Sequence, residues 1–476
     1  MLRVSHLILI TSALALPARA DDVLSASLGD IRQRIRDGQQ TQALELLEAL
    51  VAENPGSLEA QMLFQDLMRG ANRQQEIGAR YAEAANARPE DPVARFLHAR
   101  TLRGPRAVAE FTAATTLNPQ FAHAWVGLAR ALEAEGKFPE AEAAARRALA
   151  IDPNLREAHD ALGWVLEHSG NHAGAEESYR AALAIDDAYL PACFNLAVLL
   201  ARRDKGGEGL SLLRKARKTA PGDPQTFVHE GLVLGMMGRA KDAAKAYEKA
   251  VALAPKDLLV LVLLGESYAE VAEWALAKRA LDAALALDPK HAPAHAARGY
   301  SALLQGLPDA AITAYSAASK LRPANASYLY YLGLACERKG DHRQALVHYK
   351  SACDKDPRSA VYRLAYGSAL EARGRTKEAL AVYKEVTVLE PENPDGWIRY
   401  GDLNSQLRKP KVAVEALLKA KALDPKNLGL LKMLGIIYET DLNDPTAAIE
   451  CYQEYVAQGG TDKRVADWIE QLQGGK

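Results

Sequence analysis

The sequence has few cysteines, few aromatic residues and almost no excess charge. Its 476 residues include 4 cysteines, and aromatic residues make up 6%. So few cysteines cannot form the disulfide framework of a small secreted fold. Lys+Arg number 59 and Asp+Glu 60, a net charge of −1, which argues against nucleic-acid binding because that needs a strongly basic face. Scarce aromatic residues together with frequent alanine favour packed helices over a β-sheet.

Motifs of catalysis and metal binding are also missing. There is no phosphate-binding glycine loop and no HExxH pattern. His291 and His295 have a spacing that a metal accepts on a helix, but Pro293 lies between them and no third ligand is near in sequence. We therefore predict no enzyme activity, no cofactor and no metal, and interpret these histidines as solvated surface residues. We also predict four free thiols, because Cys336 and Cys353 fall about 10 Å apart on antiparallel helices.

The first twenty residues have the three regions of a secretory signal peptide. Arg3 supplies the positive start, Leu7 to Leu16 are uncharged and mostly apolar, and Ala18-Arg19-Ala20 fits the cleavage pattern. We predict a signal peptide over residues 1–20, cleaved after Ala20, and a periplasmic protein. An ordinary apolar first helix is the alternative. No segment reaches the length of about 20 apolar residues that spans a bilayer, so no transmembrane segment is expected.

From residue 24 onward the sequence repeats every 34 residues. Pro55 and Pro89 are 34 residues apart, as are Pro119 and Pro153, and proline returns at this step from Pro221 to Pro425. A fixed period of this length is typical of a solenoid. We place the repeat starts at residues 24, 58, 92, 122, 156, 190, 224, 258, 292, 326, 360, 394 and 428, with 30 residues in the third repeat.

Each repeat has the pattern of two antiparallel helices. Apolar and small residues fall at helical spacing in both halves, and Gly340 and Pro357 mark the two helix ends in the repeat from 326 to 359. Eight repeats have glycine at position 8, which we interpret as a close approach of the two helix axes. Tyrosines at position 24 are predicted to fill the space between neighbouring repeats. They are Tyr179, Tyr247, Tyr315, Tyr349 and Tyr383.

This pattern resembles the tetratricopeptide repeat (TPR) family, of the exported bacterial type, over residues 24–461. The resemblance rests on Trp125-Val126-Gly127-Leu128, on Leu162-Gly163 and Leu332-Gly333, and on the alanine, aromatic and proline positions that follow such pairs. It implies an all-α fold, a right-handed α-solenoid of about 13 helix pairs whose first helices line a concave groove. Residues 462–476 are predicted to form a C-terminal capping helix.

In TPR proteins, positions 2, 5, 9, 12 and 13 of the first helix face the groove, which is the only candidate site. Here these positions form a basic zone, an apolar zone and a mostly acidic zone. The basic zone is Arg32, Arg36, Arg69, Arg100, Arg103 and Arg130. The apolar zone is Phe194, Val198, Val228, Leu232, Met236, Leu259, Val262, Tyr300, Leu303, Leu304, Tyr330 and Leu334. The acidic zone is Glu266, Glu270, Glu337, Asp395, Asp402 and Glu439.

The zones predict two kinds of ligand. An apolar surface through five repeats is typical of a partner helix or apolar peptide, although burial between neighbouring repeats would also explain it. The basic zone would suit an acidic or carboxylate-bearing ligand, although scattered arginines are also typical of a solvated helix face. The lysine and asparagine with which chaperone-binding relatives hold a terminal carboxylate are missing, apart from Lys432.

We therefore predict a non-enzymatic scaffold that binds a protein or peptide in its groove. The resemblance implies a place in a bacterial envelope machine, such as pilus assembly, gliding motility, secretion or polysaccharide export, and the residues do not choose among these. Two alternatives stay open. One is a periplasmic holding chaperone for apolar segments, and the other, if residues 1–20 are no signal, is a cytoplasmic regulator.

Overall fold

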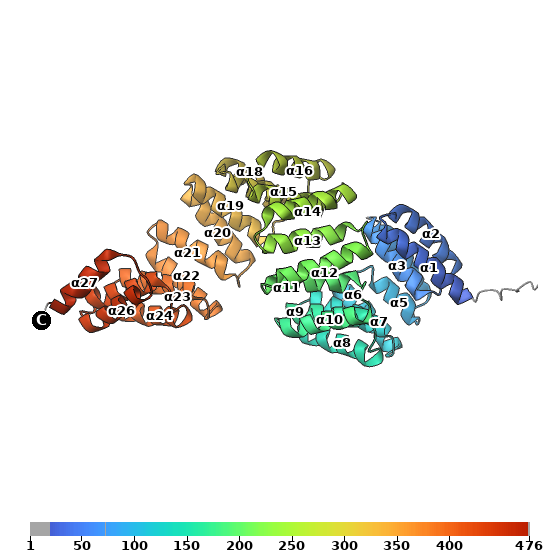
Figure 1. Cartoon of the computed structure of the whole chain (residues 1–476), viewed down its shortest axis with the longest axis horizontal. Helices are drawn as coiled ribbons and strands as arrows, with labels where there is room; N and C mark the ends of the chain where they lie inside the picture. The colour runs from blue at the N-terminus through green and yellow to red at the C-terminus, as the bar shows by residue number, and fades with distance from the viewer. Residues whose placement is uncertain (1–19, 72, 475–476) are drawn as a thin grey trace, which may run out of the picture. The chain divides into compact units, whose positions relative to one another are not determined.

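Helices make up all the regular structure of this protein in the computed structural model, which describes residues 20–71 and 73–474 (Figure 1). The predicted all-α solenoid of helix pairs is confirmed. The predicted signal peptide, except Ala20, lies outside the described residues.

The helices fall into two compact units, with the division between Val260 and Leu261. The first unit contains α1 (Ala20–Arg36), α2 (Gln40–Glu53), α3 (Leu58–Gly70), α4 (Gln74–Ala87), α5 (Pro92–Ala99), α6 (Pro105–Leu117), α7 (Ala122–Ala134), α8 (Phe138–Ile151), α9 (Arg156–His168), α10 (His172–Ile185), α11 (Leu190–Arg202), α12 (Gly206–Thr219), α13 (Pro224–Met236) and α14 (Ala240–Leu253). The division falls within α15 (Leu258–Glu270).

The second unit continues with the same alternation of first and second helices. It contains α16 (Trp274–Leu287), α17 (Ala292–Leu304), α18 (Pro308–Leu321), α19 (Ala326–Lys339), α20 (His342–Lys355), α21 (Ala360–Ala372), α22 (Thr376–Leu389), α23 (Pro394–Gln406), α24 (Pro410–Leu423), α25 (Leu428–Ile436), the π-helical turn η1 (Ile437–Asp441), α26 (Pro445–Ala457) and α27 (Lys463–Gly474).

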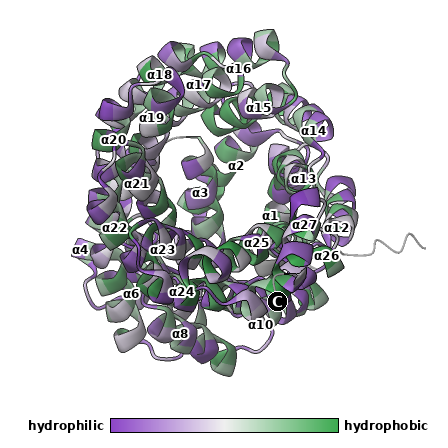
Figure 2. Cartoon of the chain, turned by 90° about the vertical axis from the view of Figure 1, so that its left-hand side faces the viewer, coloured by the Kyte–Doolittle hydropathy of each residue, from purple (hydrophilic) through white to green (hydrophobic). Residues whose placement is uncertain are grey.

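Local signals set the ends of these helices, as α19 shows. The side chain of Asn325 accepts hydrogen bonds from the backbone N–H groups of Ser327 and Tyr328, which caps the N-terminus. Gly340 ends the helix with a φ of 86°, the left-handed conformation predicted from its position. The helices labelled in Figure 2 carry both hydrophobic and hydrophilic residues, as expected of helices with one buried face.

The recurrent glycine makes room for a tyrosine ring of its own repeat. A Cβ atom on Gly163 would lie 2.7 Å from the Tyr179 ring, and one on Gly333 would lie 2.7 Å from the Tyr349 ring. The sequence interpretation assigned the glycines to close helix axes and the tyrosines to the space between repeats. The structure adds that the ring of the second helix lies directly against the glycine of the first. The predicted contact between repeats is also present, because the ring of Tyr315 stacks on that of Tyr331 in the next repeat, with the centroids 5.4 Å apart.

The tyrosine hydroxyl groups are held by glutamates. Tyr179 donates a hydrogen bond to Glu167 (3.0 Å), and Tyr383 donates one to Glu371 (3.0 Å). The same bonds join Tyr349 to Glu337 and Tyr452 to Glu439. Glu337 and Glu439 were grouped with an acidic groove surface from the sequence. In the structure they satisfy buried hydroxyl groups, which is a packing role.

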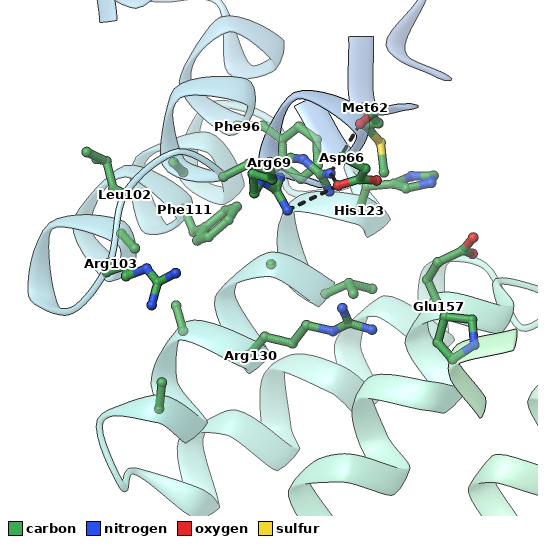
Figure 3. Close-up of a pocket in the computed structure, with 18 of the residues that line it drawn as sticks. Met62, Asp66, Arg69, Phe96, Leu102, Arg103, Phe111, His123, Arg130 and Glu157 are labelled. Carbon is green, nitrogen blue, oxygen red and sulfur yellow. Dashed lines mark hydrogen bonds and ion pairs between the residues drawn. The ribbon is translucent and has the colours of Figure 1, made fainter. Parts of the chain in front are cut away.

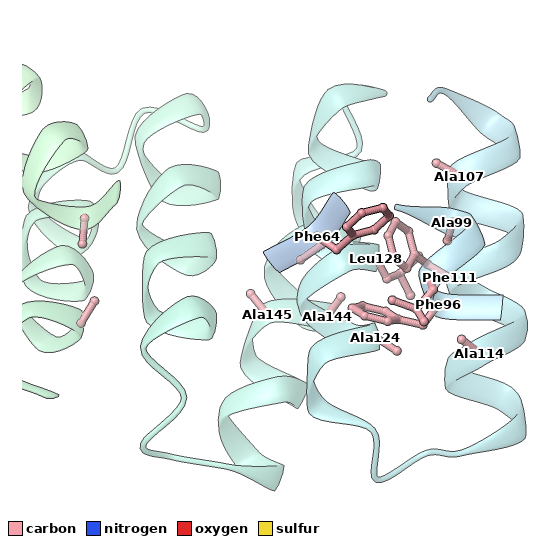
Figure 4. Close-up of a cluster of buried hydrophobic side chains, with 14 of the residues drawn as sticks. Phe64, Phe96, Ala99, Ala107, Phe111, Ala114, Ala124, Leu128, Ala144 and Ala145 are labelled. Atoms are coloured by element: carbon pink, nitrogen blue, oxygen red, sulfur yellow. The ribbon is translucent and has the colours of Figure 1, made fainter. Parts of the chain in front are cut away.

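In the third repeat, phenylalanines take the place of the core tyrosine (Figure 4), whereas the second repeat keeps a buried tyrosine, Tyr81. The rings of Phe96 and Phe111 lie with their centroids 5.9 Å apart, and Phe111 covers Gly127. Phe64 is also buried in this cluster, among alanines of α5, α6 and α7.

The third repeat is the irregular one. Its first helix, α5, has 8 residues, whereas α3 and α7 have 13 each. The chain turns into α6 through Gly104, which has a φ of 65° that favours glycine. The missing helical turns leave space between the first helices on either side of α5.

The first unit also contains a contact between loops far apart in the sequence. The backbone N–H of Gly222, between α12 and α13, donates a hydrogen bond of 3.0 Å to the carbonyl of Arg36, at the end of α1. A Cβ atom on Gly222 would lie 2.5 Å from the carbonyl carbon of Asp37. Only glycine therefore permits this approach of the two loops.

Helix α27 covers the end of the second unit. Val465 is fully buried, and the ring of Trp468 lies 5.4 Å from that of Tyr452. None of the helices described here combines the length and the apolar character needed to cross a membrane.

Candidate functional site

A cavity of about 590 Å³ lies in the first unit beside the shortened helix α5 (Figure 3). Its walls come from α3, α5, α6, α7 and the turn after α5, with Glu157 of α9 and with Tyr189 and Pro191 at the start of α11. We call it the arginine cavity. It is lined by Met62, Asp66, Arg69, Phe96, Ala99, Arg100, Leu102, Arg103, Gly104, Ala107, Phe111, His123, Val126, Gly127, Arg130, Ala131, Ala134, Glu157, Tyr189 and Pro191.

Four of the six arginines of the predicted basic zone meet in this cavity, namely Arg69, Arg100, Arg103 and Arg130. Arg32 lies elsewhere, in an adjoining cavity, where it pairs with Glu59. Arg36 forms its side-chain hydrogen bonds with Gln33 instead.

Asp66 is shared by two of the guanidinium groups. It lies 3.1 Å from Nη1 of Arg69 and 2.7 Å from Nη2 of Arg100. Arg100 also donates from Nε to Gln65. Burial lowers the pKa of Arg100, an effect that Asp66 opposes and that the positive charges of Arg69 and Arg130 increase. These three cations therefore lie close enough to act on one another.

Arg130 is fixed on the opposite wall by a buried carboxylate. Its Nη2 lies 2.7 Å from Asp160, whose other oxygen accepts a hydrogen bond of 2.9 Å from Asn195. Burial raises the pKa of Asp160, although Arg130 and Asn195 both favour the charged form. The sequence interpretation gave Asp160 no role, but an acid at an otherwise apolar helix position was the signal that could have revealed it.

Two further cavities continue the arginine cavity. One, of about 620 Å³, shares Met62, Asp66, His123, Glu157 and Tyr189 with it. The other, of about 260 Å³, shares Arg130 and Pro191. The site is therefore elongated, with apolar walls from Phe96, Phe111 and Val126 at one end.

Comparisons with known proteins identify the family of the repeats. Models of the tetratricopeptide repeat family match residues 97–155, 262–318 and 297–360, residues 360–403, and residues 157–189 and 394–427. The chain contains tetratricopeptide repeats. No curated protein matches the sequence.

Two solved structures are similar to the TPR chain. The first, the APC/C hetero-tetramer Cut9-Hcn1, has 15% sequence identity and a TM-score of 0.40, with 95% of this chain and 96% of that chain covered. The second is YrrB, described as a TPR protein with an unusual peptide-binding site. It has 23% identity and a TM-score of 0.34, with 40% of this chain and 97% of YrrB covered.

The predicted apolar zone of the TPR groove is divided between the two units and unevenly exposed. Met236, Leu259 and Leu304 are 46%, 57% and 45% exposed. Phe194 and Val228, by contrast, are buried, and Phe194 stacks on the ring of His229. Val262 is also buried, and the remaining six residues are half-buried: Val198, Leu232, Tyr300, Leu303, Tyr330 and Leu334. Partner binding by this zone stays a prediction.

The structure assembles no metal site from the described residues. They contain no group of three or more histidine, cysteine and acidic side chains that could hold a metal. His295 Nε2 lies 3.0 Å from the carbonyl of Pro289, a contact within the solenoid turn. The four cysteines are unpaired, and Cys353 is the only one of them that is not buried.

Glu266 is expected to make the stability of the second unit depend on pH. Burial, together with the charge of Glu270, raises the pKa of Glu266 from 4.5 to about 7. The folded protein thus binds this proton more tightly than the unfolded chain, so stability present at pH 4 is lost as the pH rises through 7. We expect Glu266→Gln to raise the free energy of unfolding at pH 8, by up to about 3 kcal/mol, and to change it little at pH 4. Denaturant titrations at both pH values check this, and an equal effect at both would contradict it.

Proposed function

We propose that this protein is an exported scaffold that binds a protein partner through the arginine cavity of its first unit. TPR folds serve protein–protein interaction, and the repeats occupy most of the chain. The observation that carries the proposal is the cavity, an elongated recess that combines paired cations with an apolar wall. A few well-placed polar groups in a largely apolar recess are typical of binding sites.

Residues 1–20 support export, because they contain the three regions of a signal peptide in order. We propose a periplasmic location and a role in a bacterial envelope machine such as a pilus, motility, secretion or polysaccharide-export system. Fractionation followed by N-terminal sequencing tests the location. A periplasmic chain that starts at Asp21 supports export, whereas an uncleaved cytoplasmic chain overturns it in favour of a cytoplasmic regulator.

Site-specific photo-crosslinking in living cells tests the scaffold. One probe replaces Met62 in the arginine cavity, a second replaces Leu232 in the predicted apolar zone, and a control replaces Lys245, an exposed residue of α14. We expect one discrete protein adduct at Met62 and none at Lys245.

The other outcomes of the crosslinking are informative. A smear of many client proteins would replace the scaffold by a holding chaperone. An adduct at Leu232 alone would move the partner site to the apolar zone. The absence of any adduct at Met62 and Leu232 would overturn partner binding by these surfaces.

A further inference from the structure

The charges of the arginine cavity do not cancel. Arg69 and Arg100 share the single carboxylate of Asp66. Arg103 forms no hydrogen bond or ion pair with any described residue, and the Nε of Arg69 is buried without an acceptor. A buried donor without a partner costs about 1–3 kcal/mol, so this wall has donors for which the chain supplies no acceptor.

The unpaired arginine lies beside an apolar wall. Figure 3 shows Arg103 and Arg130 around the same space, with the ring of Phe111 and Leu102 next to Arg103. A ligand there meets a guanidinium group and an aromatic face within one short stretch. Arginine matches a carboxylate with two parallel hydrogen bonds, which adds geometric specificity to the charge.

The shape of the site favours a chain over a compact ion. The arginine cavity continues past Met62 and His123 into the neighbouring cavity, whose lining includes Leu58, Leu63 and Arg32. The recess therefore combines apolar residues with charged ones, and the arginines of this second part, Arg32 and Arg156, are already paired with acids of the chain. An extended peptide presents side chains in succession along such a path, whereas a small anion would use only one end.

We propose that the arginine cavity binds an extended acidic segment of the partner, in which aspartate or glutamate alternates with apolar residues. One carboxylate pairs with Arg103, and the apolar neighbour packs against Phe111. The inference rests on the proposed scaffold function and names the chemistry of the segment that the scaffold holds. It also gives the shortened α5 a role, because the missing helical turns open the space for that segment.

The test uses fluorescence anisotropy with the full mature chain and labelled octapeptides. The acidic mixture alternates Asp or Glu with Leu, Ile, Val or Phe, and the matched mixture has Asn or Gln in place of the acids. We expect the acidic mixture to bind at least 10-fold more tightly than the matched mixture. We also expect its affinity to fall as NaCl rises from 50 to 500 mM. Equal binding of both mixtures, or no binding of the acidic mixture at 1 mM, would overturn the proposal.

Two single variants test whether Arg103 is the residue that binds the carboxylate of the peptide. Arg103→Ala removes the unpaired guanidinium and is expected to lower the affinity for the acidic mixture at least 10-fold. Arg106→Ala, three residues further on, removes an exposed arginine outside the cavity lining and is expected to leave binding unchanged. Both side chains are exposed, so both variants should fold, which circular dichroism checks. Equal losses in the two variants would reduce the effect to general surface charge and overturn the assignment.

Competition by a small acid tests whether the cavity recognises a peptide or only a simple anion. Glutarate carries two carboxylates without a peptide chain, and we expect it to compete only at concentrations far above those of the acidic mixture. Competition by glutarate at the same concentration as the peptides would contradict the proposed peptide site and indicate a site for small anions. The crosslinking at Met62 is independent of this result. A discrete adduct there together with no preference for acidic peptides would retain the scaffold and overturn the acidic segment.

Discussion

Tyr179→Ala is expected to lower the free energy of unfolding of the first unit by about 3–5 kcal/mol, the range for deletion of a buried aromatic ring. Tyr179 is fully buried, and its ring fills the space against Gly163. Deletion leaves a cavity between α9 and α10, because the backbone of two packed helices closes only partly around it. Urea titration followed by circular dichroism measures the loss.

Tyr179→Phe is the matched control, because it keeps the ring and removes only the hydroxyl. The hydroxyl donates to Glu167, which also pairs with Arg202 at 2.7 Å. Glu167 therefore keeps one partner, and we expect a loss of about 0.5–1.5 kcal/mol. A Phe variant as unstable as the Ala variant would show that the hydrogen bond rather than the ring packing holds this repeat together.

Gly231→Val is expected to cost about 1–3 kcal/mol, the usual cost of overpacking a core. A Cβ atom on Gly231 would lie 2.5 Å from the ring of Tyr247, in the second helix of the same repeat. The ring is rigid and buried, so the two helices of the repeat have to separate. The change is measured by the same urea titration, and it should also increase amide hydrogen exchange in α13 and α14.

Gly235→Ala provides the control within the same helix. Gly235 lies one turn beyond Gly231 and is exposed, and a Cβ atom there would meet nothing within 4 Å. Alanine restricts the unfolded chain and is a better helix former, so we expect a gain of about 0.5–1 kcal/mol. Destabilisation by both substitutions would mean that helix α13, and not the tyrosine contact, selects glycine at position 231.

The arginines of the candidate site could be predicted from the sequence, but the cavity could not. Helical periodicity places Arg100 and Arg130 on the groove side of their helices, since each occupies the same position of its repeat. Their partners come from other repeats: Asp66 reaches Arg100 across 34 residues, and Asp160 reaches Arg130 across 30. Such pairs depend on the stacking of neighbouring repeats, which the pattern within one repeat does not specify.

The acidic residues also show what helical periodicity cannot predict. Periodicity put Glu337 and Glu439 on the groove face, but the structure turns both carboxylates to tyrosine hydroxyl groups. A residue on the border between two faces of a helix can contact either side. Its choice depends on which polar group of the neighbouring helix needs an acceptor.

The sequence by itself determined the helices, their pairing and the repeat fold, because these follow from short-range features: glycine and proline at helix ends, apolar and small residues at helical spacing, and a 34-residue period. The tertiary structure alone decided where the charges meet. The short α5 opens the arginine cavity between its neighbours, and Gly222 brings the loop before α13 onto the end of α1. Both features depend on how each repeat is rotated on the next, and small rotations add up over several repeats to set distances that no local pattern encodes.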